Sequence, residues 1–144
     1  MARILIADDH ESVRNSLRAF LESQAGWRVV GEAVNGRDAV EKAERLEVDL
    51  VLLDVIMPEM DGLAAARLIR ERMPKTAVIV LSHSDSPEII RHAFAAGAMA
   101  FVAKVDLALD LIPAVQAAHH RRRFVSRSVQ NRPTSSPPTS QVLG

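Results

Sequence analysis

The sequence predicts an α/β protein built as a (βα)5 unit, a doubly wound parallel five-stranded sheet in a three-layer sandwich. Short runs of β-branched and other apolar residues alternate with longer stretches in which apolar residues recur every three or four positions. Several of the short runs are almost continuously apolar, which is typical of parallel strands covered on both faces. Strands that alternate with helices join through right-handed crossovers, so the sheet should be parallel.

Five strands and five helices follow from this alternation. The strands are expected at residues 3–8, 28–34, 49–54, 77–82 and 99–103. The helices are expected at residues 12–24, 36–47, 62–73, 86–96 and about 110–121. Each strand is therefore followed by one helix, and no internal repeat is visible.

Capping and breaking residues set the expected helix ends. Asn35 is suited to cap the second helix at its start. Pro74 should end the third helix, and Gly97 should follow the fourth as a C-terminal cap. Pro113 would break the fifth helix if it lay in the interior. We therefore expect Asp110 to be the N-cap, which places Pro113 in the first turn, where no hydrogen bond is lost.

Composition indicates one folded domain and a short tail. The 144 residues are 48% apolar and contain no cysteine, which excludes disulfides and cysteine–zinc sites and fits a reducing, cytoplasmic compartment. No apolar run is long enough to span a membrane. Residues 1–118 hold 13 basic and 18 acidic side chains, so this body should not grip nucleic acid directly. We expect a domain at 1–121 and a basic, then Pro/Ser/Thr-rich, disordered tail or linker at 122–144.

Polar side chains stand at the carboxyl ends of four expected strands. Asp8 and Asp9 end the first strand, Asp54 ends the third, Ser82 ends the fourth and Lys104 follows the fifth. Ligands of doubly wound sheets bind at this edge. Neighbouring carboxylates repel unless a cation lies between them, and an all-oxygen cluster suits Mg²⁺. A metal ion, an amine and a hydroxyl around one carboxylate are the parts needed for phosphoryl transfer to that carboxylate.

Five segments carry a resemblance to a known family. They read ILIADDHESVRNSLRAFL, EAVNGRDAVEKA, DLVLLDVIMPEMDGLAAARLIR, VIVLSHSD and AFAAGAMAFVAKVD. In this order and spacing they resemble the receiver domain of two-component response regulators over roughly residues 3–121. The resemblance implies a flavodoxin-like, CheY-like fold. It also implies phosphorelay signalling, with phosphate accepted from a histidine kinase.

The resemblance implies a phosphoacceptor and a metal site. Asp54 would carry the phosphoryl group as an aspartyl phosphate. Mg²⁺ would be held by Asp8, Asp9, Asp54 and the backbone carbonyl of Ile56. His10, which follows this pair of carboxylates, is expected to be a surface residue and not a ligand.

The resemblance also implies groups that respond to the phosphate. Ser82 stands where a hydroxyl binds the phosphoryl group, and Lys104 where a lysine pairs with it. Phe101 matches the aromatic switch of the family, with simple core packing as the alternative. The chain would thus be a phosphoacceptor that assists its own phosphorylation and dephosphorylation and not an enzyme with a separate substrate. It would change a protein-interaction surface and form a homodimer when phosphorylated.

Residues 97–129 are similar to the NarL/FixJ subfamily, whose members carry a LuxR-type helix-turn-helix after a linker. The printed sequence reaches such a linker but shows no further helix pair. Contact with DNA would therefore need a domain outside this sequence. We expect either the receiver part of a transcription regulator or a stand-alone receiver that acts through protein partners.

Three features depart from the usual pattern or flank the site. Val105 replaces the proline that often follows the lysine, so we expect a trans or strained bond between Lys104 and Val105. His83 is large where receivers usually have a small residue, so it either shields the phosphoryl group from water or merely points to solvent. Ile56 and Ser84 are expected to influence rates and not the chemistry.

Two other classes fit less well. A Mg²⁺-dependent phosphatase with an aspartate nucleophile, as in the haloacid-dehalogenase family, would have an acid two residues after Asp54, but Ile56 stands there. A flavin-binding module would need a phosphate-binding Ser/Thr/Gly loop after the first strand and stacking aromatics. The chain has DDHES there and only five aromatic residues.

Overall fold

A parallel sheet forms the centre of the protein in the computed structural model, which describes residues 2–130. The strand order is β2-β1-β3-β4-β5-β6, and every neighbouring pair is parallel. The strands are β1 (Ala2–Ala7), β2 (Trp27–Ala33), β3 (Leu50–Asp54), β4 (Ala77–Ser82), β5 (Ala100–Ala103) and β6 (Phe124–Val125). The helices are α1 (Glu11–Glu22), α2 (Gly36–Leu46), α3 (Gly62–Arg72), α4 (Pro87–Ala95), the 3₁₀ turn η1 (Lys104–Asp106), α5 (Leu107–His119) and α6 (Arg127–Gln130).

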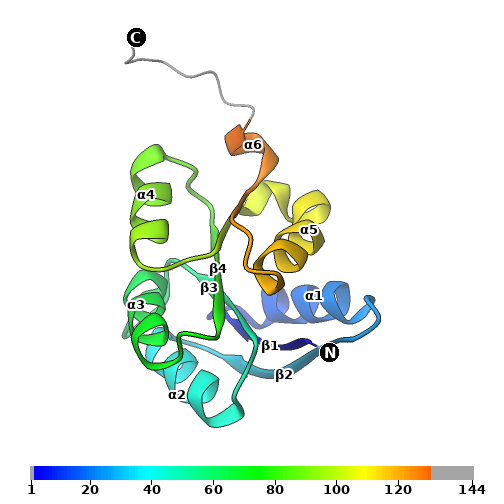
Figure 1. Ribbon diagram of the computed structural model, residues 1–144, viewed down its shortest axis with the longest axis vertical. Coiled ribbons are helices and arrows are strands. Elements are labelled where there is room, and N and C mark those ends of the chain that lie inside the picture. The colour runs from blue at the N-terminus through cyan, green and yellow to red at the C-terminus, as the bar shows by residue number, and fades with distance from the viewer. Residues whose placement is uncertain (1, 131–144) are drawn as a thin grey trace.

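Two apolar cores hold the layers together, one on each face of the sheet. Helices α2, α3 and α4 cover one face, and α1 and α5 cover the other (Figure 1). Alternate residues of a strand point to opposite faces, so Leu5 joins the first core and Ile4 and Ile6 join the second. Every residue of β3 and β4 is buried, as their continuous apolar runs predict, and every residue of β5 is buried as well.

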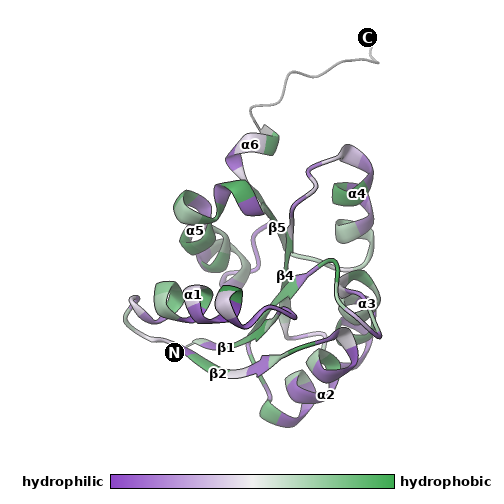
Figure 2. Ribbon diagram, turned by 180° about the vertical axis from the view of Figure 1, so that it is seen from behind, coloured by the Kyte–Doolittle hydropathy of each residue, from purple (hydrophilic) through white to green (hydrophobic). Residues whose placement is uncertain are grey.

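The distribution of hydropathy follows these layers. In Figure 2 the central strand β4 is mostly hydrophobic, whereas the helices also carry hydrophilic residues. Among the described residues, no helix is both long and apolar enough to cross a bilayer.

All five predicted strands and all five predicted helices are present, with ends that differ by at most three residues. The Asn35 side chain caps α2 as predicted, because it accepts a hydrogen bond of 2.7 Å from the amide of Asp38. Gly97 follows α4 with φ +105°, a conformation that glycine adopts without strain. Pro74 directly follows Met73, the C-cap of α3.

The predicted start of the fifth helix is wrong. Helix α5 begins at Leu107, directly after the 3₁₀ turn η1, so Pro113 lies inside the helix. Asp110 is not the N-cap. Its carboxylate is buried and accepts hydrogen bonds from the backbone amide and the guanidinium of Arg127. The helix therefore continues through Pro113, which lacks the N–H that would bond to the carbonyl of Leu109.

The folded part of the chain extends beyond residue 121, where the sequence predicts a basic tail. Phe124 and Val125 form β6, which pairs with β5 and makes the sheet six-stranded where five strands are predicted. Ser126 is completely buried, and α6 follows it. The Pro/Ser/Thr-rich part of the predicted tail, residues 131–144, lies outside the described residues.

Candidate functional site

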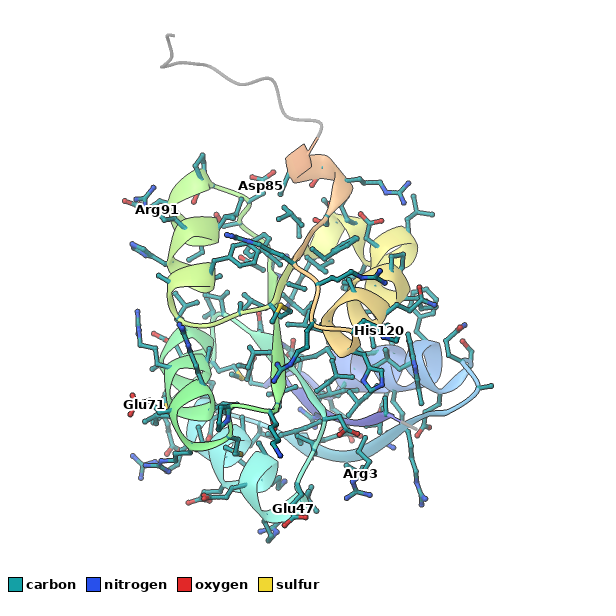
Figure 3. The ribbon with its side chains drawn as sticks, in the orientation of Figure 1. Arg3, Glu47, Glu71, Asp85, Arg91 and His120 are labelled. Carbon is teal, nitrogen blue, oxygen red and sulfur yellow. The ribbon has the colours of Figure 1, made fainter. Side chains whose placement is uncertain are left out.

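A pocket of about 380 Å³ lies at the carboxyl edge of the sheet, where β1, β3, β4 and β5 end. Figure 3 shows Asp85, from the loop after β4, near the end of the molecule opposite Arg3 and Glu47. The residues that line the pocket are Asp9, His10, Asp54, Val55, Ile56, Ser82, His83, Ser84, Ile89 and Lys104. The structure thus brings together the side chains that the sequence places at four strand ends.

A buried lysine that lines this pocket bridges two carboxylates. The Nζ atom of Lys104 lies 3.2 Å from Oδ1 of Asp54 and 3.3 Å from Oδ2 of Asp8. The lysine side chain is 9% exposed and Asp8 and Asp54 are 1% and 7% exposed, so all three charges are shielded from water. Burial of several charges is tolerated when opposite charges pair and hydrogen-bond. Two acids and one amine leave this trio with excess negative charge.

The positive charge near Asp54 does not fully offset its burial and the neighbouring negative charges. Burial raises the pKa of Asp54, Lys104 lowers it, and the charges of Asp8 and Asp9 raise it again. The net pKa of Asp54 is raised above its usual value of 3.8. An additional cation beside these carboxylates would therefore stabilise the ionised form of Asp54.

Asp8, Asp9 and His10 form a cluster that could hold a metal ion. One ligand atom from each of these residues lies within 4.8 Å of the others. His10 Nδ1 is 3.1 Å from Oδ1 of Asp8 and 3.2 Å from Oδ1 of Asp9. Carboxylate oxygens are the donors that Mg²⁺ prefers, so Asp8 and Asp9 fit that ion, whereas an imidazole is a softer donor. His10 is largely exposed, as predicted, and it also lines the pocket, which its position in the sequence does not reveal.

Two arginines and one glutamate support the loop that carries Asp8. Arg14 Nη1 donates a hydrogen bond of 2.7 Å to the backbone carbonyl of Asp8, and Nε of the same guanidinium lies 2.7 Å from Glu32 Oε1. Arg18 lies 2.7 Å from the other Glu32 oxygen. The hydrogen bond from Arg18 lowers the pKa of Glu32, burial raises it and Arg14 lowers it, with a net lowering. The network thus joins β2 and α1 to the carboxylate loop.

Ser82 and His83 occupy the β4 side of the pocket. The Ser82 hydroxyl is nearly buried and accepts a 3.0 Å hydrogen bond from the amide of Ser84. A hydroxyl that accepts this bond keeps its proton for donation to another oxygen. His83 and Ser84 are exposed and line the pocket. Ile56 also lines the pocket and is 78% exposed.

Close packing fixes the loop between β3 and α3. The amide of Gly62 donates a 2.8 Å hydrogen bond to the carbonyl of Val55. A Cβ atom at Gly62 would lie 2.1 Å from the carbonyl oxygen of Asp54, so only glycine permits this approach. Ile56 therefore lies in a loop that directly follows β3 and packs against the end of that strand.

Phe101 lies away from the pocket. Its side chain is completely buried in the core beneath α2, α3 and α4. Phe101 is therefore a core residue in this structure. Its role as a switch stays a prediction. The peptide between Lys104 and Val105 is trans, because the described residues contain no cis bond.

A family model for the response regulator receiver domain matches residues 4–116. The chain belongs to the response regulator receiver family. Two curated relatives support this assignment. The receiver is 36% identical over 118 residues to the transcriptional regulatory protein LiaR of Bacillus subtilis, covering 82% of this chain and 56% of LiaR. It is 34% identical over 128 residues to the response regulator VraR of Staphylococcus saprophyticus, covering 88% of this chain and 61% of VraR. The receiver thus spans less than two thirds of both.

Solved structures agree with this family. A LuxR-family two-component response regulator from Aurantimonas matches with a TM-score of 0.87 and 29% identity, over 90% of this chain and 93% of that one. The isolated receiver of RcsB from Salmonella enterica with the phosphomimetic BeF₃⁻ matches with a TM-score of 0.83 and 26% identity, over 90% and 96%. RcsB dimers bound to DNA match with a TM-score of 0.81 and 26% identity, over 90% and 66%. The predicted family, fold and role in two-component signalling are thereby confirmed.

Proposed function

We propose that this receiver accepts a phosphoryl group on Asp54 from a histidine kinase in a Mg²⁺-dependent reaction. The observation that carries the proposal is the buried Lys104 amine between Asp54 and Asp8, beside a pocket on the carboxyl edge of the sheet. Receivers belong to two-component systems, in which the phosphate donor is a phosphorylated histidine. Asp54 would supply the nucleophile and Lys104 part of the positive charge that this transfer needs, and Mg²⁺ would supply the rest.

The reaction is a displacement at phosphorus. A carboxylate oxygen of Asp54 forms a bond to phosphorus while the bond from phosphorus to the donor nitrogen breaks, and the imidazole leaves with the electron pair. Asp8, Asp9, Asp54 and the carbonyl of Ile56 would hold Mg²⁺. The ion would neutralise charge on the phosphoryl oxygens. Lys104 pairs with one phosphoryl oxygen, and the Ser82 hydroxyl donates a hydrogen bond to another.

Ser82 and Lys104 are also the contacts through which the phosphate changes the receiver. A ligand shifts a conformational equilibrium only when it contacts the two states differently. The Ser82 hydroxyl and the Lys104 amine would move toward the phosphoryl oxygens. Phe101 on β5 would repack with them and alter the surface around α4, β5 and α5.

The protein would act as a phosphoacceptor and not as a phosphatase with turnover. The residue two positions after Asp54 is Ile56, whose apolar side chain lies exposed at the pocket and cannot act as a general acid. An aspartyl phosphate formed here would be lost to water slowly. Ile56, His83 and Ser84 would set that rate.

The output of the receiver is proposed to be transcriptional. LiaR is named a transcriptional regulatory protein, and RcsB is solved as dimers bound to DNA. By analogy, phosphorylation would promote a homodimer, and DNA would be bound through a LuxR-type domain outside this sequence. A stand-alone receiver that acts through protein partners is the alternative. A cytoplasmic location belongs to the same proposal.

Intact-mass spectrometry after incubation with Mg²⁺ and acetyl phosphate tests the proposal. The wild-type protein should gain one phosphoryl group, and Asp54→Asn should gain none. Asp49→Asn is the matched control, because Asp49 lies before β3, at the opposite edge of the sheet, and accepts a bond from the Arg3 amide. Absence of phosphate on folded wild-type protein would refute phosphoacceptance, and equal modification of Asp54→Asn would refute the site.

A further inference from the structure

The segment that follows α5 holds the residues on both sides of Lys104. We name residues 124–129 the strap. The amide of Ala103, directly before Lys104, donates a 3.0 Å hydrogen bond to the hydroxyl oxygen of Ser126 in the strap. The amide of Ser126 donates a 3.0 Å bond to the carbonyl of Phe101 on β5. Ser126 is completely buried, so these bonds are shielded from water.

On the other side of Lys104, the strap binds a buried carboxylate. Asp106 is the last residue of η1 and is 8% exposed. Its Oδ2 atom accepts hydrogen bonds from the amide of Ser128 at 3.0 Å and from the Ser128 hydroxyl at 2.6 Å. Burial raises the pKa of Asp106, but the hydrogen bonds from Ser128 and Ser126 outweigh this effect and lower it. The hydrogen bonds from the strap therefore favour the ionised form of this carboxylate.

A second carboxylate fixes the strap to α5. Asp110 is 3% exposed and accepts bonds from the Arg127 amide at 2.7 Å, from Nε at 3.0 Å and from Nη2 at 2.8 Å. Figures 1 and 2 show α6 beside the beginning of α5, in agreement with these contacts. Hydrogen bonds to ionised groups are roughly twice as strong as neutral ones, and removal of one partner leaves a buried charge unpaired. Detachment of the strap would thus cost free energy, because Asp106 and Asp110 would both lose these hydrogen bonds.

These contacts couple the strap to the pocket over a very short distance along the chain. Lys104 lies between Ala103, bonded to Ser126, and Asp106, bonded to Ser128. A movement of the 3₁₀ turn that carries Lys104 would therefore strain the hydrogen bonds at Ala103 and Asp106.

We propose that Ser126 and Ser128 are positioning residues for Lys104, and that the strap carries the change at Asp54 to the C-terminal end of the described chain. The inference rests on the proposed function of Lys104 as the partner of the phosphoryl group. In this proposal the conformational change passes from Lys104 to the strap through the hydrogen bonds of Ala103 and Asp106. None of the residues that line the pocket belongs to the strap.

The first test measures the hold of the strap on Lys104 without phosphate. Backbone amide hydrogen exchange of residues 104–107 is compared between wild type, Ser126→Ala and Ser128→Ala. Exchange should become about tenfold faster in both variants, since each loses a hydrogen bond at a buried group. Ser23→Ala, which removes a side-chain bond to the Phe20 carbonyl at the end of α1, is the matched control and should leave these amides unchanged. Unchanged exchange in folded Ser128→Ala would overturn the positioning role.

The second test separates positioning from loss of metal binding. With acetyl phosphate, Ser128→Ala should be phosphorylated at least about threefold more slowly, because a misplaced charge stabilises the transition state less well. Its Mg²⁺ dissociation constant, measured by calorimetry, should match that of wild type, because Ser128 lies outside the carboxylate cluster. An unchanged rate, or an equal loss of Mg²⁺ affinity, would count against the proposal.

The third test follows the signal outward in wild-type protein. Addition of BeF₃⁻ with Mg²⁺ should change exchange at the amides of Arg127 and Ser128, and Asp54→Asn should show no change. If Lys104 responds to BeF₃⁻ while the strap amides do not, transmission through the strap is refuted. If folded wild type takes up neither BeF₃⁻ nor acetyl phosphate, the proposed function fails instead, and the phosphate-free exchange measurement still decides the positioning role.

Discussion

Glu32 is the residue through which the outer strand β2 supports the carboxylate loop. Its two oxygens bind Arg14 and Arg18, and Arg14 in turn binds the carbonyl of Asp8. A carboxylate with a lowered pKa in the folded state stabilises the fold above its ordinary pKa, here 4.5. This contribution is lost as the pH falls through the lower pKa of the folded protein.

The network predicts a pH-dependent difference between wild type and Glu32→Gln. The wild-type protein should lose stability more steeply than the variant as the pH is lowered from about 5 to about 3. Urea midpoints measured across this range test the prediction. Glu41→Gln on α2 is the control, since Glu41 is exposed. Parallel curves for wild type and Glu32→Gln would show that the arginines stabilise Glu32 equally in the unfolded chain.

His83 is predicted to control the access of water to the phosphoryl group. It is exposed, directly follows Ser82 and lines the pocket. We expect His83→Ala to lose phosphate about two- to fivefold faster, because a smaller side chain admits water to the aspartyl phosphate. Decay after removal of acetyl phosphate measures this rate, with His92→Ala on α4 as the control. An unchanged lifetime would indicate that His83 only faces solvent.

At the scale of single residues, prediction succeeds where a residue's position follows from the strand it ends. Asp8, Asp54 and Lys104 come together because parallel strands present their carboxyl ends at one edge. Arg14 could not be found this way, because its contact with Asp8 depends on how α1 packs. His10 has a sequence signal, its position directly after two carboxylates, but exposure and proximity together emerge only from the fold.

At the scale of elements, long apolar and amphipathic segments were predictable and short ones were not. The five predicted strands and helices each have periodicity over four or more residues. Strand β6 has two residues and α6 has four, too few for any periodic signal. Their positions are set by side-chain contacts of Ser126, Arg127 and Ser128 with residues about 20 positions earlier in the chain.

The same contacts explain the misplaced start of α5. Taking Asp110 for an N-cap is reasonable from sequence, because aspartate caps helices and Pro113 fits the first turn. In the structure Asp110 accepts hydrogen bonds from Arg127, and α5 contains Pro113 in its interior. Tertiary hydrogen bonds to a buried charge outweigh the local preference.

Replacement of Pro113 tests the cost of that arrangement. We expect Pro113→Ala to stabilise the protein by about 1 kcal/mol or more. Alanine restores a donor for the Leu109 carbonyl, and this gain is partly offset by the freer unfolded chain. Thermal and urea unfolding measure the change, with Gln116→Ala on the exposed face of α5 as the control. A destabilised variant would mean that the proline ring contributes packing that exceeds the lost hydrogen bond.

At the scale of the whole molecule, the residues that stabilise the fold and the residues of the candidate site lie in different places. The two apolar cores lie on the faces of the sheet, and the candidate site lies at its carboxyl edge. The apolar residues of the strands join helices on both faces, while the charged groups collect where the strands end. The net negative charge of residues 1–118 is therefore concentrated in part at the site that would receive a cation. Of the basic residues after Asp110, Arg127 is used within the fold to pair that carboxylate.

Because the site's carboxylates repel one another, metal binding should stabilise the entire fold. A ligand that binds only the folded protein at about 100 times its dissociation constant adds about 2.7 kcal/mol to the free energy of unfolding. For a domain of this size such a gain raises the melting temperature by roughly 5–15 °C. Thermal unfolding with and without Mg²⁺ measures the gain directly, independently of phosphate.

Two variants make this prediction specific to the proposed metal site. Asp9→Asn should lose most of the Mg²⁺-dependent gain and, without Mg²⁺, should be at least as stable as wild type, because one repelling charge is removed. Asp49→Asn, at the amino edge of the sheet, should keep the full gain. A Mg²⁺ response that survives in Asp9→Asn would place the ion elsewhere. A wild type without any response would show that the three carboxylates are balanced by Lys104 and their surroundings alone.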